Sequence, residues 1–299
     1  MAVDDLLDLA NFALEEAGYS VWILLDRLDV AFAEAPQLEE RALRSLFRVY
    51  LDLNKYKFVS LKIFLRSDIW DRITSSGFRE ASHITRDITI EWKKPGLLNL
   101  IVNRAVQNEP VQKYFNVKPE EVLETQDRQR SFFYRMCPEQ VDVGEKKPST
   151  LNWVLSRTKD GNNITAPREV IHFMNELRSV QARKIEVGDH EANNDKLFER
   201  KVFKAALKEV STVRLKQTLY AELSDLQPFV KKLIKNKAEH TIRTLAETWE
   251  IDKDEAKNIA NELSYVGFFE KRSSKTEGTT YWIPFLFRDG LELVQGSAF

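Results

Sequence analysis

Two carboxylates, Asp26 and Asp29, follow an unbroken apolar run from Val21 to Leu25. A short run of this kind predicts a strand that is buried on both faces. In open α/β sheets, ligands bind beyond the carboxyl ends of the strands, and a carboxylate held there is a hard oxygen ligand for Mg²⁺. The sequence therefore predicts a magnesium site at Asp26. The alternative is an ordinary strand followed by a polar turn, because apolar runs that end in Asp are common.

The elements after this run predict a parallel sheet that would position the site. Apolar residues at helical spacing predict a helix over 38–53, and a second strand follows at 59–66. Strand, helix and strand in this order form a crossover between parallel strands. A third strand is expected at 84–92, before a helix that begins at Pro95. With its flanking residues, the first strand is expected at about 20–26.

Three segments in this order resemble the second half of bacterial STAND/KAP-like P-loop ATPases, which are relatives of the AAA type. They are Leu-Leu-Asp-Arg-Leu-Asp at 24–29, Ile-Phe-Leu-Arg-Ser-Asp at 63–68 and Ile-Thr-Ile-Glu-Trp at 88–92. The resemblance implies a partial P-loop NTPase core at 1–92 and a helical lid-like region at 93–180. It also implies an ATP-dependent switch or sensor that forms a homo-oligomer, with anti-phage defence as one setting for such proteins.

The resemblance also assigns roles to the two carboxylates. Asp26 would hold the Mg²⁺ that bridges the phosphates of ATP. Arg27 stands where these ATPases commonly have a second carboxylate, so either Asp29 orients the attacking water or hydrolysis is slow. We expect slow hydrolysis, which is more typical of a switch than of a motor.

Two arginines are candidates for reading the γ-phosphate. Arg66 follows the second strand, where a guanidinium group offers bidentate phosphate contacts. Alternatively, it forms a structural ion pair with Asp68 or Asp26. By resemblance, Arg168 is a nucleotide-binding residue, because it follows Pro167 at the start of an expected lid helix. Its alternative role is that of a solvated residue in the first helical turn.

The chain departs from the family pattern at the phosphate loop. No G-x-x-x-x-G-K-[ST] motif occurs in its 299 residues, although these ATPases have this motif upstream of the strand that ends at Asp26. The residues before that strand predict a helix that ends at Gly18. The chain is therefore a fragment, or it docks on a partner protein that supplies the loop, or it has lost nucleotide chemistry. We favour the fragment.

Residues 201–299 predict a helical extension and a winged-helix domain. Three helices and a hairpin are expected at 227–236, 240–249, 252–266 and 268–284. A winged helix often binds DNA through its third helix, but here that helix has a net negative charge, which repels phosphate. The candidate DNA-binding residues are therefore Lys271, Arg272 and Lys275 in the hairpin. The alternative, packing against the core or a partner protein, is favoured slightly.

Composition limits the remaining function classes. The net charge is −1, with 43% hydrophobic and 30% charged residues, so no global charge attracts nucleic acid or membrane. The single cysteine, Cys137, excludes an internal disulfide and favours a reducing cytoplasm. No apolar run approaches membrane-spanning length. The charged stretch 181–200 predicts a linker. We therefore expect a cytoplasmic, mostly helical protein without a membrane partner.

Overall fold

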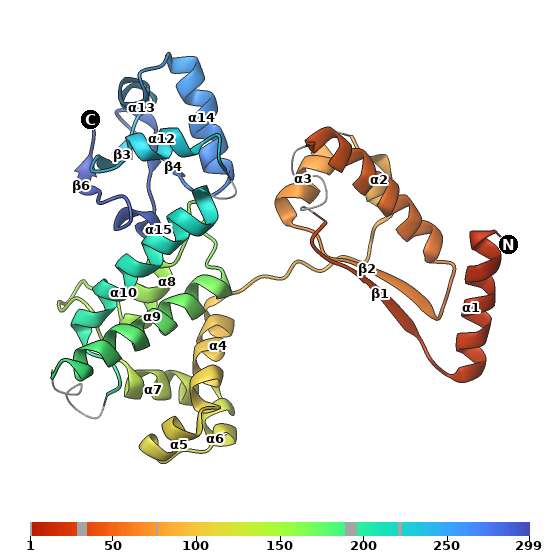
Figure 1. Ribbon diagram of the computed structural model, residues 1–299, viewed down its shortest axis with the longest axis horizontal. Helices are drawn as coiled ribbons and strands as arrows, with labels where there is room; N and C mark the ends of the chain where they lie inside the picture. The colour runs from red at the N-terminus through yellow and green to blue at the C-terminus, as the bar shows by residue number, and fades with distance from the viewer. Residues whose placement is uncertain (1, 29–34, 76, 189–195, 221–222) are drawn as a thin grey trace. The chain divides into compact units, whose positions relative to one another are not determined.

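The computed structural model divides the chain into two compact units, Met1–Glu91 and Trp92–Phe299 (Figure 1). It describes residues 2–28, 35–75, 77–188, 196–220 and 223–299. Most of these residues lie in helices, with one small parallel sheet and one small mixed sheet. The prediction of a helix-rich chain with a parallel strand pair is confirmed at this level.

The first unit is built on the expected strand, helix and strand. Its elements are α1 (Val3–Ala17), β1 (Val21–Leu25), α2 (Pro36–Leu53), β2 (Val59–Ile63), α3 (Ser67–Ser75) and the 3₁₀ helix η1 (Arg79–His83). The strands β1 and β2 pair in parallel, from Val21 opposite Val59 to Leu25 opposite Ile63. Gly18 ends α1 with a φ of 70°, a left-handed conformation that glycine adopts without strain.

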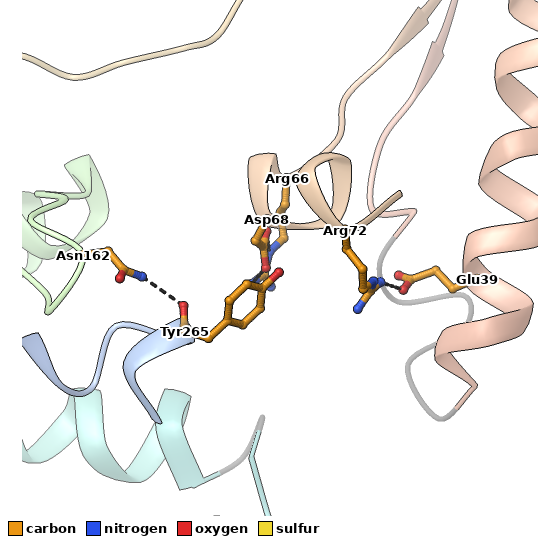
Figure 2. A network of polar contacts seen from close by, with 6 residues as sticks. All are labelled: Glu39, Arg66, Asp68, Arg72, Asn162 and Tyr265. Carbon is orange, nitrogen blue, oxygen red and sulfur yellow. Dashed lines mark hydrogen bonds and ion pairs between the residues drawn. The ribbon is translucent and has the colours of Figure 1, made fainter. Parts of the chain in front are cut away.

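A small core joins α2 and α3. It consists of the buried residues Leu43, Phe47, Ile69, Ile73 and Phe78. An ion pair between Arg72 of α3 and Glu39 of α2 spans the same two helices (Figure 2). On β2, Val59 and Leu61 are also buried, so β2 is held by packing as well as by its hydrogen bonds to β1.

Two expectations for this unit are wrong. The strand β1 is not buried on both faces, because Trp22 is 66% exposed and Leu24 is 59% exposed. Within the described residues β1 has a strand on one side alone, and a buried strand needs neighbours on both sides. The third strand at 84–92 is absent from the described structure. Ile88 there is 91% exposed, because no neighbouring strand provides the hydrogen bonds and packing that an alternating segment needs.

The second unit begins with a helical layer. Its elements are α4 (Lys94–Val106), α5 (Glu109–Phe115), α6 (Pro119–Leu123), α7 (Gln126–Met136), α8 (Thr150–Arg157), α9 (Pro167–Glu186), α10 (Arg200–Val213) and the π-helical segment η2 (Arg214–Leu219). Proline stands in the first turn of α4, α5, α6 and α9, where its missing N–H leaves no helical bond unmade. Packing of α9 against α10 brings the rings of Phe173 and Phe203 to 6.1 Å.

The remainder of this unit contains a sheet. Its elements are α12 (Gln227–Lys232), β3 (Lys237–His240), α13 (Ile242–Trp249), α14 (Lys253–Tyr265), β4 (Glu270–Ser274), β5 (Gly278–Trp282), α15 (Phe285–Arg288) and β6 (Val294–Ser297). The strand order is β4-β5-β3-β6, in which β4 and β5 form an antiparallel hairpin and β6 is parallel to β3. The expected helices and hairpin are present, and β3 and β6 extend the sheet beyond the expectation.

One hydrophobic core runs through the whole second unit. It includes Phe133 and Phe173 before the charged stretch 181–200 and Phe203, Phe268 and Phe287 after it. The first part of that stretch continues α9 as far as Glu186, and α10 begins at its end. Asn162, in the loop before α9, also donates a hydrogen bond of 3.0 Å to the carbonyl oxygen of Tyr265 in α14 (Figure 2). Residues on both sides of the stretch thus belong to one packed body.

Candidate functional site

The parallel pairing places the ends of β1 and β2 at one edge of the sheet. Leu25 lies opposite Ile63, and its carbonyl oxygen accepts a hydrogen bond of 2.8 Å from the Phe64 amide. Asp26 follows β1 directly, and Arg66 follows β2 before α3. The candidate carboxylate and the first candidate guanidinium group therefore stand at the same carboxyl edge, as the sequence predicts.

Asp26 lies at a sharp change in backbone direction. Its Oδ1 accepts a hydrogen bond of 2.8 Å from the backbone amide of Arg27. Arg27 has a φ of 57°, a left-handed conformation that is uncommon outside glycine. This turn fixes the carboxylate at the end of β1 and leaves it exposed to solvent. Asp29, the expected water-orienting residue, lies outside the described residues.

Arg66 pairs with Asp68. Its Nε lies 3.0 Å from Oδ1 of Asp68, and its Nη2 lies 2.8 Å from Oδ2, in a bidentate arrangement (Figure 2). Of the two ion-pair partners that the sequence left open, the structure therefore shows Asp68. The two side chains are 57% and 31% exposed, and exposed pairs of this kind contribute at most about 1 kcal/mol. A phosphate could therefore compete for this guanidinium group.

A groove of about 1410 Å³ passes these residues within the first unit. Its walls carry apolar and aromatic side chains, including Trp22 and Tyr50. Lys62 Nζ lies 5.0 Å from the centre of the Trp22 ring, within cation–π distance. The lining includes six basic residues against two acidic ones. These are Arg27, Lys55, Lys57, Lys62, Arg66 and Arg86 against Asp26 and Asp87. The groove thus favours an anionic ligand with an apolar portion.

The side chains near Asp26 show what kind of Mg²⁺ site the first unit offers. In the described part of the chain, no three His, Cys, Asp or Glu side chains lie close enough to hold a metal ion. Mg²⁺ is usually held by one or two carboxylates together with waters and substrate phosphates. Asp26 therefore fits a site in which the phosphates of a nucleotide and water complete the coordination of Mg²⁺, and not a site built from protein ligands alone.

Arg168 lies in the second unit, whereas Asp26 and Arg66 lie in the first. It follows Pro167 at the start of α9, as predicted. Its side chain is 73% exposed, with Nε 3.7 Å from a carboxylate oxygen of the buried Glu169. Arg214, at the start of η2, approaches that oxygen more closely, with Nη1 at 3.2 Å. The sequence did not identify Arg214 as a partner, because 45 residues separate it from Glu169.

The three candidate DNA-binding residues do not share one face. Lys271 and Lys275 are exposed on the hairpin, and Lys275 lies in its tip between β4 and β5. Arg272 lies on the other face of β4, because neighbouring residues in a strand point to opposite sides. Its guanidinium group pairs with Glu270, at 2.8 Å for Nε and 3.2 Å for Nη2.

The sequence did not identify two further arginines, Arg157 of α8 and Arg288 of α15. Both guanidinium groups lie 4.4 Å from the centre of the Phe285 ring. They are 131 positions apart in the chain, so no local pattern indicates their proximity. The single cysteine, Cys137, is fully buried in the core. Burial raises the pKa of its thiol, so it is a poor nucleophile.

Comparison of the chain with protein-family models, with curated proteins and with solved structures found no match. Among the described residues, every helix is too short or too polar to cross a membrane.

Proposed function

We propose that residues 1–91 form the magnesium side of a nucleotide site of the STAND/KAP-like P-loop type, and that the protein is an ATP-dependent switch. The observation that supports this proposal is the parallel pair β1–β2, with Asp26 and Arg66 at one carboxyl edge beside a basic groove. This is the edge at which open α/β sheets bind their ligands.

In this proposal, Asp26 holds the Mg²⁺ of Mg-ATP, and Asp29 orients water. Arg66 exchanges its pairing with Asp68 for the γ-phosphate, which is a better bidentate acceptor than an exposed carboxylate. Arg168, exposed at the start of α9, is the second γ-phosphate sensor. Without a second carboxylate next to Asp26, hydrolysis is slow, and bound ATP acts through conformation. Oligomerisation and a role in bacterial anti-phage defence complete the proposal.

The proposed site needs a phosphate loop that the 299 residues do not contain. Within the described residues β1 is an edge strand, and the unpaired backbone N–H and C=O groups of such an edge support a further strand on that side of the sheet. The loop would be supplied with that strand, either by residues preceding these in a longer polypeptide or by a partner protein. In the second case, the chain is an interaction module that completes its partner's site.

The test uses the protein in its native form, purified through a tag at its C-terminus. Its intact mass shows whether residues precede Met1, and fluorescence titration measures Mg²⁺-dependent ATP binding. We expect Asp26→Asn to weaken that binding by about tenfold or more, because it removes the charged metal ligand. Asp52→Asn, an exposed carboxylate on α2, serves as the matched control. A native protein that binds no Mg-ATP, or an Asp26→Asn variant that binds it normally, contradicts the proposal.

A second candidate function is a winged-helix regulator that binds DNA through its hairpin. The order of helices α12, α13 and α14 followed by the β4–β5 hairpin supports it, together with the exposed Lys271 and Lys275. Each phosphate contact that is lost should reduce the salt dependence of binding by about one unit of slope. Anisotropy titrations of Lys271→Gln and Lys275→Gln at several salt concentrations measure this. Unchanged slopes exclude the hairpin as the contact.

A further inference from the structure

Three arginines and three aromatic rings form a continuous ladder in the second unit. The order is Arg272, Trp282, Arg288, Phe285, Arg157 and Trp153. The distances from guanidinium carbon to ring centre along it are 3.7, 4.3, 4.4, 4.4 and 4.8 Å. All five distances are within cation–π range. We call this set the arginine ladder.

The fold brings the ladder together from distant parts of the chain. Arg272 and Trp282 lie on the same face of the β4–β5 hairpin. Trp282 lies opposite Glu270, and Glu270 and Arg272 are two positions apart in β4, so their side chains point to the same face. The short helix α15 contributes Phe285 and Arg288, and the end of α8 contributes Arg157. The ladder therefore connects the hairpin to the helical layer.

The guanidinium groups of Arg157 and Arg288 have few polar partners. In the part of the chain that the structure describes, Arg157 donates one hydrogen bond of 2.9 Å to Ser156 Oγ, and Arg288 donates one of 2.8 Å to the Ile283 carbonyl oxygen. Nη2 of Arg288 is buried without a partner. A guanidinium group has five N–H donors, and a buried donor without an acceptor destabilises the folded protein.

Three of the nearby carboxylates already have partners, and Asp289 attracts Arg288 electrostatically without a direct ion pair between them among the described residues. Both oxygens of Glu270 accept hydrogen bonds from Arg272. Glu239 accepts one of 2.8 Å from Thr280 Oγ1. Asp142 forms an ion pair of 2.8 Å with Lys204. The positive charges of Arg157 and Arg288 are therefore not neutralised by a direct ion pair among the described residues.

The pKa values of Arg288 and Arg157 agree with the absence of a direct ion pair to either guanidinium group. Burial, followed by repulsion from Arg272 and Arg157, lowers the pKa of Arg288 to about 10, although attraction to Glu239 and Asp289 partly opposes the shift. Burial also lowers the pKa of Arg157. An anion bound by the two groups would relieve the repulsion and accept hydrogen bonds from the unused donors.

We propose that Arg157 and Arg288 of the arginine ladder bind a phosphate group through their unused N–H donors. The planar fork of each guanidinium group matches the oxygens of a phosphate. The rings already stack on guanidinium groups, so they are not available for stacking with bases, and recognition rests on the phosphate. This inference goes beyond the proposed ATPase function, because it concerns the second unit and needs neither Asp26 nor a phosphate loop.

The test measures binding of two phosphate probes to the full chain at constant ionic strength. Pyrophosphate represents a small phosphorylated ligand, and a single-stranded oligonucleotide of about 20 nucleotides represents a nucleic-acid backbone. Calorimetry and anisotropy give the affinities. We expect at least one probe to bind, and Arg157→Gln and Arg288→Gln each to weaken its binding by about tenfold or more. The probe that binds identifies the source of the phosphate.

Control variants separate this site from general charge effects. Arg243→Gln removes an exposed arginine of α13 and should change either affinity by less than about twofold. Arg157→Lys keeps the charge but removes the fork, and should cause an intermediate loss even if Arg288→Gln fails to fold. Binding of neither probe by the wild-type chain overturns the proposal. So does a loss in Lys271→Gln with normal binding in Arg157→Gln, which assigns the contact to the hairpin.

Discussion

The two units of the chain bury their apolar residues to different degrees. In the second unit, Trp249, Phe133, Phe173 and Phe203 are almost completely buried in one core. In the first unit, α1 contains no buried residue, and none of the residues of β1 is fully buried. Folding free energy depends largely on apolar burial. The second unit therefore has the means to be stable by itself, whereas β1 and α1 present apolar surface that an additional partner could cover.

The largest expected effect comes from the core of the second unit. Phe203→Ala should lower its free energy of unfolding by about 3–5 kcal/mol, because it removes a buried ring and leaves a cavity. Hydrogen exchange followed by mass spectrometry resolves the units by peptide, so it shows which of them loses protection. Phe12→Ala, the same change at an exposed residue of α1, is the matched control. Equal loss of protection in both units would contradict the comparison.

A backbone contact offers the next test of whether the second unit is one body. The Gly161 amide donates a hydrogen bond of 2.7 Å to the Gly267 carbonyl oxygen, and a Cβ at Gly161 would lie 2.3 Å from the Phe269 carbonyl oxygen. Gly161→Ala should therefore cost about 1–3 kcal/mol in urea unfolding. Gly96→Ala, where the nearest atom would be 3.7 Å away, should not destabilise. A neutral Gly161→Ala would indicate that this loop and the C-terminal sheet are not packed together.

A pH effect should also be confined to the second unit. His240 is buried, and burial lowers its pKa below the ordinary value of about 6.5, although its contact of 3.0 Å with the Lys237 carbonyl oxygen partly opposes the shift. The unfolded chain thus gains a proton at a higher pH than the folded one. Stability is complete above the unfolded pKa and falls as the pH drops from there toward the folded pKa.

Urea unfolding at about pH 7.5 and pH 5.5 measures this effect. His240→Gln should remove the contribution of His240 to the difference, although it also lowers stability at both pH values. An equally large pH dependence in the variant would mean that other groups cause it.

The smallest expected effect is at the exposed strand. Leu24→Ala in β1 should change the free energy of unfolding by less than about 0.5 kcal/mol, whereas Leu61→Ala in the buried face of β2 should cost about 2–4 kcal/mol. Leu24 is 59% exposed and Leu61 is 6% exposed. Urea unfolding at low and high protein concentration provides the measurement. A large cost for Leu24→Ala would show that β1 is covered in solution, by a second copy or another partner.

Local pattern predicted much of the first unit and part of its candidate site. The apolar runs located β1 and β2, the helical spacing located α2, and Asp26 and Arg66 follow their strands as expected. The pattern did not predict the exposure of β1. An apolar run indicates that a strand is suited to burial, but it does not show whether other elements of the protein cover that strand. The strand expected at 84–92 is absent from the described structure for the same reason.

The sequence by itself predicted α2, the positions of β1 and β2 and the Asp that follows β1, because helical spacing and apolar runs are local patterns, and the order of strand, helix and strand predicted the parallel pairing. Tertiary structure decided the rest. It left β1 exposed, paired Arg214 with Glu169, and placed Arg157 and Arg288 against the same ring, that of Phe285. Such contacts join residues that are distant in the chain, so they depend on how the elements pack and cannot be read from local sequence patterns.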